Sequence, residues 1–219
     1  MDILLTLVDF ILHLDHHIAD LIENYGLWTY AILFAIVFVE TGLVVMPFLP
    51  GDSLLFVAGA FAARGQFNLA TLIGLLAAAA ILGNTSNYWI GRRLGPKVFA
   101  WENSRFFNRA AFDKTHAFYE KHGAITIIVT RFLPFMRTFS PFVAGVAAMT
   151  HTRFQLFNIA GGLLWVVSLC VAGYWFGNIA WIKNNLTLVI LALIIIPALP
   201  TVVVAGREWL ASRARRAAN

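Results

Sequence analysis

The chain has 219 residues, of which 60% are hydrophobic and only 12% are charged, and its mean hydropathy is +0.76. Soluble domains carry about 25% charged residues, so this composition excludes an ordinary soluble protein and predicts an integral membrane protein. The net charge of +5 does not indicate a nucleic-acid partner, because the basic residues gather at the ends of apolar segments, where they set orientation in a membrane. The length favours one membrane domain over residues 1–219.

The first 26 residues interleave acidic and apolar side chains and contain no Lys or Arg. This pattern predicts an amphipathic N-terminal helix over residues 1–26, at the membrane surface or packed on the bundle. Of His13, His16 and His17, which lie near Asp15, only His13 and His17 share a helical face, and this favours a polar interface over a metal site. We expect neither a metal site nor a cofactor.

The first long apolar run covers residues 27–49 and is interrupted near its end. Pro47, Pro50 and Gly51 lie within five residues, and such a sequence cannot continue a straight helix. Non-helical backbone at membrane depth must be buried in protein or line a wet cavity. We therefore expect residues 40–63 to form a re-entrant hairpin or a broken helix that these three residues shape.

Residues 69–90 are apolar over the length of an ordinary membrane span. Asn84 and Asn87 lie three positions apart there, so they share a helical face, and we expect them to line an internal cavity. Residues 92–122 are rich in basic and aromatic side chains, which predicts an amphipathic segment on the cytoplasmic side.

A second interrupted run covers residues 124–149. Pro134 and Pro141 break it, so we expect another re-entrant hairpin. By the distribution of basic residues, this hairpin enters from the cytoplasm and the first enters from the opposite side. Two ordinary spans and a basic cytoplasmic tail follow, over residues 154–181, 186–205 and 207–219.

A short internal repeat accompanies the two interrupted runs. The Phe-Val-Ala-Gly sequence of residues 56–59 recurs at residues 142–145, and both copies follow a proline-broken, charge-bearing run. Paired interrupted segments in two halves of a chain indicate an inverted-repeat transporter. We therefore predict an all-α polytopic membrane protein with two opposed re-entrant hairpins and about three to four full transmembrane helices.

Four charged residues lie inside or against the interrupted runs: Glu40, Asp52, Arg131 and Arg137. A single charge at the centre of a membrane helix costs about 2.5–3.5 kcal/mol, so each is a candidate functional residue. Residues six apart on a straight helix point about 240° apart, so the two arginines can face one cavity only because Pro134 lies between them. An alternative role is structural, since two acids and two bases can form buried ion pairs that lock the hairpins together.

The chemistry of these residue types suits a lipid phosphate. An arginine guanidinium can hold a phosphate through two parallel hydrogen bonds, so we assign phosphate binding to Arg131 and Arg137. A poorly hydrated cavity raises the pKa of a carboxyl group, whereas a nearby arginine lowers it. The two effects together can place proton binding near physiological pH. We assign proton exchange to Glu40 or Asp52.

The segments that carry these charges resemble a known family. Residues 38–42 (Phe-Val-Glu-Thr-Gly) and 47–52 (Pro-Phe-Leu-Pro-Gly-Asp) are similar to the first signature of the DedA family, which is also called the SNARE-associated Golgi or VTT-domain superfamily. Residues 131–138 and 141–145 are similar to the second signature. Further positions that match the family are Gly83, Asn84, Asn87, Tyr88, Gly91, Arg92, Asn158, Gly161, Trp165, Gly173, Tyr174 and Gly177.

The resemblance implies a multi-pass protein of the bacterial inner membrane that supports membrane homeostasis and depends on the proton-motive force. Some members of the family recycle the carrier lipid undecaprenyl phosphate, and others move phospholipids between leaflets. The family's acidic pair and arginine pair fall on the four buried charges of this chain. Many members carry an acid where this chain has Asn84, so the role of that acid is not carried over.

The leading functional hypothesis is therefore proton-coupled translocation of an anionic lipid, undecaprenyl phosphate or a phospholipid, by a non-enzymatic membrane protein that is able to form homo-oligomers. The alternative is a proton-coupled cation or small-solute antiporter, in which the acids bind the cation and the arginines balance charge. An intramembrane lipid-phosphate hydrolase is disfavoured, because the apolar hairpins contain no histidine that can act as nucleophile or acid.

Overall fold

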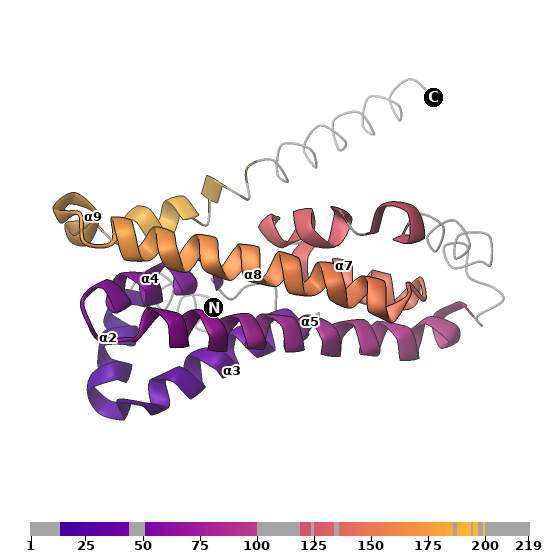
Figure 1. Cartoon of the computed structure of the whole chain (residues 1–219), viewed down its shortest axis with the longest axis horizontal. Helices are drawn as coiled ribbons and strands as arrows, with labels where there is room; N and C mark the ends of the chain where they lie inside the picture. Colours follow the sequence, from indigo (N-terminus) through magenta and orange to yellow (C-terminus); the bar gives the residue numbers. More distant parts are fainter. Residues whose placement is uncertain are drawn as a thin grey trace, which may run out of the picture.

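The computed structural model describes residues 14–43, 51–99, 119–123, 125–133, 136–185, 188–193, 195–196 and 199. Within these ranges the chain is helical and has no strand (Figure 1). The named elements are α2 (Leu14–Tyr25), α3 (Trp28–Gly42), α4 (Gly51–Ala63), α5 (Leu69–Phe99), the 3-10 turn η1 (Thr130–Phe132), α7 (Met136–Val146), α8 (His151–Phe176) and α9 (Ala180–Asn184).

Two long helices, α5 and α8, form the centre of the fold and pack against each other (Figure 1). Both are long and apolar enough to cross a membrane, and they are the two such helices in the described part of the chain. The helices α3 and α4 are apolar but shorter. The re-entrant hairpins and the number of full spans stay predictions.

The ends of the long helices differ from those predicted. Helix α5 continues to Phe99, into the segment that we expected on the membrane surface. Its extension is held in place because Gly91 and Gly95 lie against the backbone of α7, and Arg92 donates to the Met149 carbonyl at 3.2 Å. Helix α8 ends at Phe176, so the predicted span to residue 181 is too long there.

The short helices α4 and α7 each pack on a long helix from the other half of the chain, α4 on α8 and α7 on α5. In each pair, a glycine of one helix lies directly against a backbone carbonyl of the other, and the contact is reciprocal. The two copies of the Phe-Val-Ala-Gly sequence occupy equivalent places in these pairs, as an internal repeat predicts. The contacts are Gly59 on Cys170, Gly173 on Phe56, Gly145 on Tyr88 and Gly91 on Phe142.

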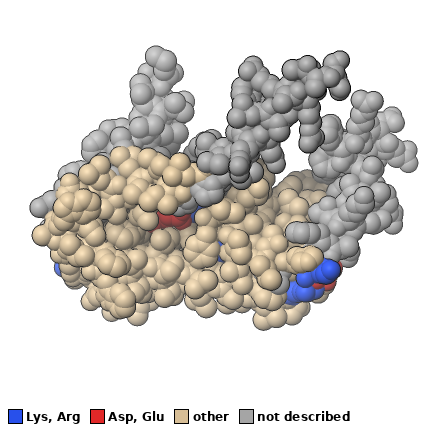
Figure 2. All heavy atoms as spheres, turned by 90° about the horizontal axis from the view of Figure 1, so that it is seen from above, with Lys and Arg blue, Asp and Glu red and all other residues tan. Residues whose placement is uncertain are grey.

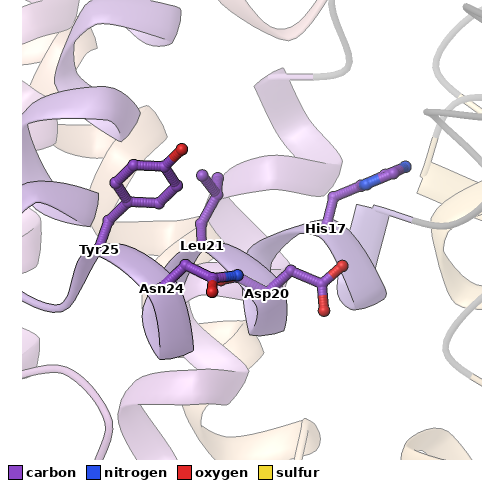
Figure 3. A pocket seen from close by; sticks show the side chains of 5 residues that line it. All are labelled: His17, Asp20, Leu21, Asn24 and Tyr25. Atoms are coloured by element: carbon purple, nitrogen blue, oxygen red, sulfur yellow. The ribbon is translucent and has the colours of Figure 1, made fainter.

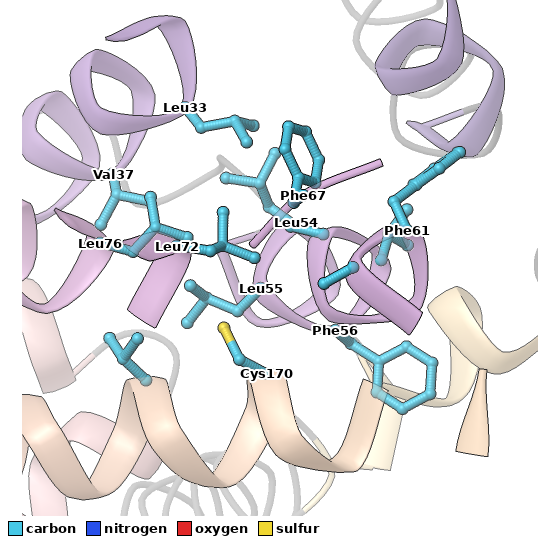
Figure 4. Close-up of a cluster of buried hydrophobic side chains, with 14 of the residues drawn as sticks. Leu33, Val37, Leu54, Leu55, Phe56, Phe61, Phe67, Leu72, Leu76 and Cys170 are labelled. Carbon is cyan, nitrogen blue, oxygen red and sulfur yellow. The ribbon is translucent and has the colours of Figure 1, made fainter. Parts of the chain in front are cut away.

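The main hydrophobic core lies where α3, α4, α5 and α8 meet (Figure 4). Its central side chains are fully buried, among them Leu33 and Val37 of α3, Leu55 of α4, and Leu72 of α5. Full burial of such a side chain contributes about 1.5–3 kcal/mol in water, whereas inside a lipid bilayer close packing supplies most of the stabilisation. The core also contains Ile18, so helix α2 is packed on the bundle.

The interruptions of the two broken runs are partly visible. Helix α3 ends at Gly42 and is followed by Leu43 in an extended conformation, and η1 is followed by Leu133 in a similar conformation. Gly51 is the first residue of α4. Three of the predicted hairpin-shaping residues, Pro47, Pro50 and Pro134, lie outside the described residues, as do residues 1–13, most of 92–122, and the tail.

The prediction for Pro141 is wrong. We expected it to break the run, but α7 continues through it from Met136 to Val146. A proline inside a helix removes one hydrogen bond and costs about 3 kcal/mol. Close packing of α7 on α5, with Gly145 against the Tyr88 carbonyl, holds the helix together despite that cost.

Candidate buried charge site

Three of the four predicted charges meet in the structure, and each comes from a different helix. Arg137 in the first turn of α7 donates from Nη1 to Asp52 Oδ1 at 2.8 Å and pairs through Nη2 with Glu40 Oε1. The side chains of Glu40, Arg137 and Asp52 are 0%, 7% and 16% exposed. One guanidinium is therefore shared by two carboxylates, and we call these three residues the charge triad.

The start of α4 places both acids of the charge triad. Asp52 lies in the first turn of α4, and the Glu40 carboxylate lies against Gly51, so that a Cβ atom at Gly51 would collide with it. Unpaired backbone N–H groups at a helix N-terminus attract negative charge. Gly51 therefore leaves the space in which the acid of α3 reaches the N-terminus of α4.

Trp165 of α8 completes this arrangement. Its indole Nε1 donates to Asp52 Oδ1 at 2.8 Å, and its ring centre lies 5.4 Å from the guanidinium carbon of Arg137, within cation–π range. Trp165 is among the positions that match the family, but no role was predicted for it from the sequence. The available signal was a tryptophan in the middle of an apolar span, whose buried N–H needs an acceptor.

Arg131 is buried but does not join the charge triad. Its side chain is 3% exposed, and its Nη2 donates to the backbone carbonyl of Asn158 at 3.2 Å and also to Asn158 Oδ1. Among the described residues no carboxylate pairs with it, and its Nε has no hydrogen-bond partner. The Arg137 guanidinium is near enough to repel it electrostatically.

A neutral polar network fixes Arg131. The Asn158 side-chain nitrogen donates to the Ile81 carbonyl at 3.0 Å and to Thr85 Oγ1 at 3.2 Å, so its oxygen is turned toward the guanidinium. Gly161 and Gly162 leave room beside the arginine, since a Cβ atom at Gly161 would lie 3.3 Å from Arg131 Cδ. The network orients Arg131 without neutralising its charge.

Asn87 joins the ends of two helices next to the charge triad. Its side-chain nitrogen donates to the Thr138 carbonyl at 2.7 Å and to the Thr41 carbonyl at 3.3 Å. Thr41 follows Glu40 and Thr138 follows Arg137, so this contact holds the two ion-pair partners together. Asn84 is buried on the same helix.

In Figure 2, a few acidic and basic atoms appear in the middle of a mostly uncharged face, and a larger group of charges lies at one end. On α2, a separate shallow pocket of about 200 Å³ is lined by His17, Asp20, Leu21, Asn24 and Tyr25 (Figure 3). Within the described ranges no group of three or more His, Cys, Asp or Glu side chains is placed to hold a metal.

Replacing Trp165 with phenylalanine tests how much the indole donor stabilises the charge triad. Trp165→Phe keeps an aromatic ring over Arg137 but removes the hydrogen bond to Asp52. Hydrogen bonds to charged groups contribute about 1.5–3 kcal/mol, so we expect a loss of that size in the free energy of unfolding, measured by denaturant titration in micelles. The matched control is Trp175→Phe on the exposed side of α8, and equal stabilities of the two variants would contradict the assigned role.

Comparisons with known proteins agree with the resemblance. The VTT domain matches residues 49–175, more than half of the chain. The chain is 52% identical to Protein DedA of Escherichia coli (strain K12) over 205 residues, which cover 93% of this chain and 94% of that protein.

Two further relatives are membrane proteins by name. The chain is 46% identical to uncharacterized membrane protein ML0287 of Mycobacterium leprae over 174 residues, which cover 80% of this chain and 78% of that protein. It is 36% identical to inner membrane protein YghB of Escherichia coli (strain K12) over 194 residues, 86% and 83% of the two chains. No solved structure matches it. The chain therefore belongs to the DedA family of membrane proteins, which is defined by the VTT domain.

Proposed function

We propose that this protein moves an anionic lipid between the leaflets of the bacterial inner membrane and binds the lipid phosphate at Arg131 and Arg137. The observation that carries the proposal is the state of Arg131, a buried cation in a membrane protein for which the described residues supply no carboxylate. Intramembrane charges are expensive and are retained mainly where they act on a substrate or an ion. The candidate substrates are undecaprenyl phosphate and phospholipids.

A phosphate that crosses an apolar layer needs cations along its path, and arginine provides paired donors that match its oxygens. Arg137 is held by two carboxylates in the structure. A lipid phosphate must compete with these carboxylates, and protonation of either one weakens its hold on Arg137. This competition couples lipid binding to the exchange of a proton at Glu40 or Asp52, which accounts for dependence on the proton-motive force without any covalent chemistry.

We further propose that the interrupted runs at residues 40–63 and 124–149 enter the membrane from opposite sides, with the C-terminus in the cytoplasm. The equivalent packing of α4 on α8 and of α7 on α5 supports this topology, because an inverted repeat places the same unit on both sides of the membrane. Both hairpins deliver charges to the same region, Asp52 from the first and Arg137 from the second.

The alternative of a proton-coupled cation antiporter has weaker support. A cation site needs carboxylate oxygens that are free to bind the ion, whereas Arg137 already pairs with both Glu40 and Asp52. Binding of a second cation would have to displace the guanidinium from a buried position.

Proteoliposomes that contain a fluorescent lipid phosphate test the proposal. We expect the purified protein to accelerate leaflet exchange, measured by chemical quenching of the label in the outer leaflet. Arg131→Ala and Arg137→Ala should each reduce the rate at least about tenfold, because a hydrogen bond to a charged group contributes about 1.5–3 kcal/mol. Arg93→Ala, which removes an exposed arginine of α5, should exchange lipid like the wild type. A pH change that depends on added cation, with no lipid exchange, would instead establish the antiporter.

A further inference from the structure

We infer that the two buried arginines have unequal tasks: Arg131 is the resting anion site, and Arg137 reaches the phosphate only after Glu40 takes up a proton. One proton would then accompany each negative charge of the lipid phosphate. This inference rests on the proposed function and adds to it an order of binding and a stoichiometry.

The hydrogen-bond donors of the two arginines have different partners. Both terminal nitrogens of Arg137 are bonded to carboxylates. Arg131 is bonded only to the neutral oxygens of Asn158. The Nε of each arginine has no partner among the described residues, so the two differ in the partners of their terminal nitrogens. An arriving phosphate can therefore bind Arg131 without displacing an acid, whereas at Arg137 it must compete with two acids.

The charges of the four ionisable groups at the site balance one another. The charged groups that surround Arg137 in the described part of the chain are Glu40 from α3, Asp52 from α4 and Arg131 from η1. The neighbouring side chains from α5 and α8, Asn87 and Trp165, are neutral. With all four groups ionised the net charge is zero, because the charge triad carries one negative charge and Arg131 carries one positive charge.

A lipid phosphate with one negative charge disturbs this balance. Its binding leaves one uncompensated charge in a buried site, and such a charge is strongly unfavourable. Uptake of one proton from water by a carboxylate restores neutrality. The carboxylate becomes a carboxylic acid, its ion pair with Arg137 is lost, and the freed guanidinium nitrogen can donate to a phosphate oxygen.

The surroundings of the two acids identify the one that takes the proton. Asp52 accepts hydrogen bonds from both Arg137 and Trp165 and is partly exposed. Glu40 is fully buried, and its Oε2 lies beside the Gly51 backbone without a hydrogen bond to any described side chain. The neutral form therefore costs less at Glu40, and Oε2 is the oxygen that is free to carry the proton.

The test measures proton uptake when the purified full-length protein binds lipid in a weakly buffered detergent solution. One arm uses phosphatidylglycerol, whose phosphodiester keeps a single charge near neutral pH, and the other uses undecaprenyl phosphate, a monoester. We expect the wild type to take up about one proton per bound phosphodiester, and its affinity to rise by up to about tenfold for each unit of falling pH. If only the monoester binds, we compare the number of protons taken up per bound lipid in the wild type and in Glu40→Gln. The wild type should take up about one proton more, because protons that the lipid itself takes up are counted equally in both proteins.

Three variants complete the test. Glu40→Gln should bind lipid with an affinity that no longer depends on pH through this site, and without the associated proton. Arg131→Gln should lose binding at every pH, and Arg93→Gln should match the wild type. Saturable lipid binding by the wild type without this proton uptake would overturn the inference, even if every variant failed to fold. A folded Arg131→Gln that binds lipid with the affinity of the wild type would also overturn it. A wild type that binds and exchanges neither lipid would instead refute the proposed function itself.

Discussion

Replacement of Arg137 with alanine is expected to abolish lipid exchange and to lower the free energy of unfolding by about 3–5 kcal/mol. The reason is the sharing of its guanidinium by Glu40 and Asp52. Without it, the buried Glu40 and the partly exposed Asp52 face each other with no guanidinium between them. Removing one partner of a buried ion pair is far more damaging than never having the pair. Denaturant titration in micelles measures the loss, and leaflet exchange in proteoliposomes measures the activity.

The control for this variant is Arg93→Ala, which removes an exposed arginine and should change the free energy of unfolding by no more than about 0.5 kcal/mol. A loss below about 1 kcal/mol for Arg137→Ala would contradict the prediction, because that is the range of a hydrated surface ion pair. Arg137→Lys should have an intermediate effect, since one ammonium group cannot match the fork by which the guanidinium reaches two carboxylates.

A neutral version of the charge triad separates its structural role from its functional role. The triple variant Glu40→Gln, Asp52→Asn and Arg137→Gln removes all three charges; the two acid replacements preserve the shape of the side chain, and the third shortens it. Neutral replacements of buried ion pairs are often harmless to stability, so we expect most of the loss in Arg137→Ala to be recovered. Lipid exchange should stay absent. Restored exchange would show that the charges only hold the hairpins together.

The second large effect is expected where helices touch through glycine. In Gly59→Ala a new Cβ atom would collide with the Cys170 carbonyl of α8, and in Gly145→Ala with the Tyr88 carbonyl of α5. Neither backbone can move without separating a helix pair, so each variant should lose about 1–3 kcal/mol of unfolding free energy, the usual cost of overpacking. Because the two pairs are equivalent, we expect similar losses at the two sites.

Gly74→Ala is the matched control for this experiment. Gly74 lies in α5, and a Cβ atom there would meet nothing within 4 Å. Alanine is favoured over glycine in a helix by about 1 kcal/mol, so this variant should be neutral or more stable than the wild type. If Gly59→Ala and Gly145→Ala also behaved in this way, the close approach of the helices would be refuted.

The local sequence predicts some of the helix breaks and not others. The break after Gly42 and the break after Phe132 agree with the prediction, since each comes shortly before prolines that disfavour a continuous helix. Pro141 was misjudged because α7 packs closely on α5, and this tertiary packing outweighs the cost of the hydrogen bond that the proline removes. The extension of α5 was missed for a related reason, since its stabilising contacts come from α7 and from Met149, far along the chain.

The candidate site divides in the same way. The sequence marked all four buried charges, because a charge in an apolar run is costly at any position and can be recognised without knowing its partners. It did not indicate that Arg137 pairs with both acids while Arg131 donates hydrogen bonds to Asn158. Nor did it indicate that Trp165 donates a hydrogen bond to Asp52.

Composition and residue order thus determined the membrane class, the interrupted helices, the internal repeat and the identity of the buried charges, each of which depends on chemistry within a short stretch of chain. Only the tertiary structure decided which charges pair. The partners of Arg137 lie 85 and 97 positions away, and whether an arginine meets a carboxylate or an amide depends on how separate helices pack.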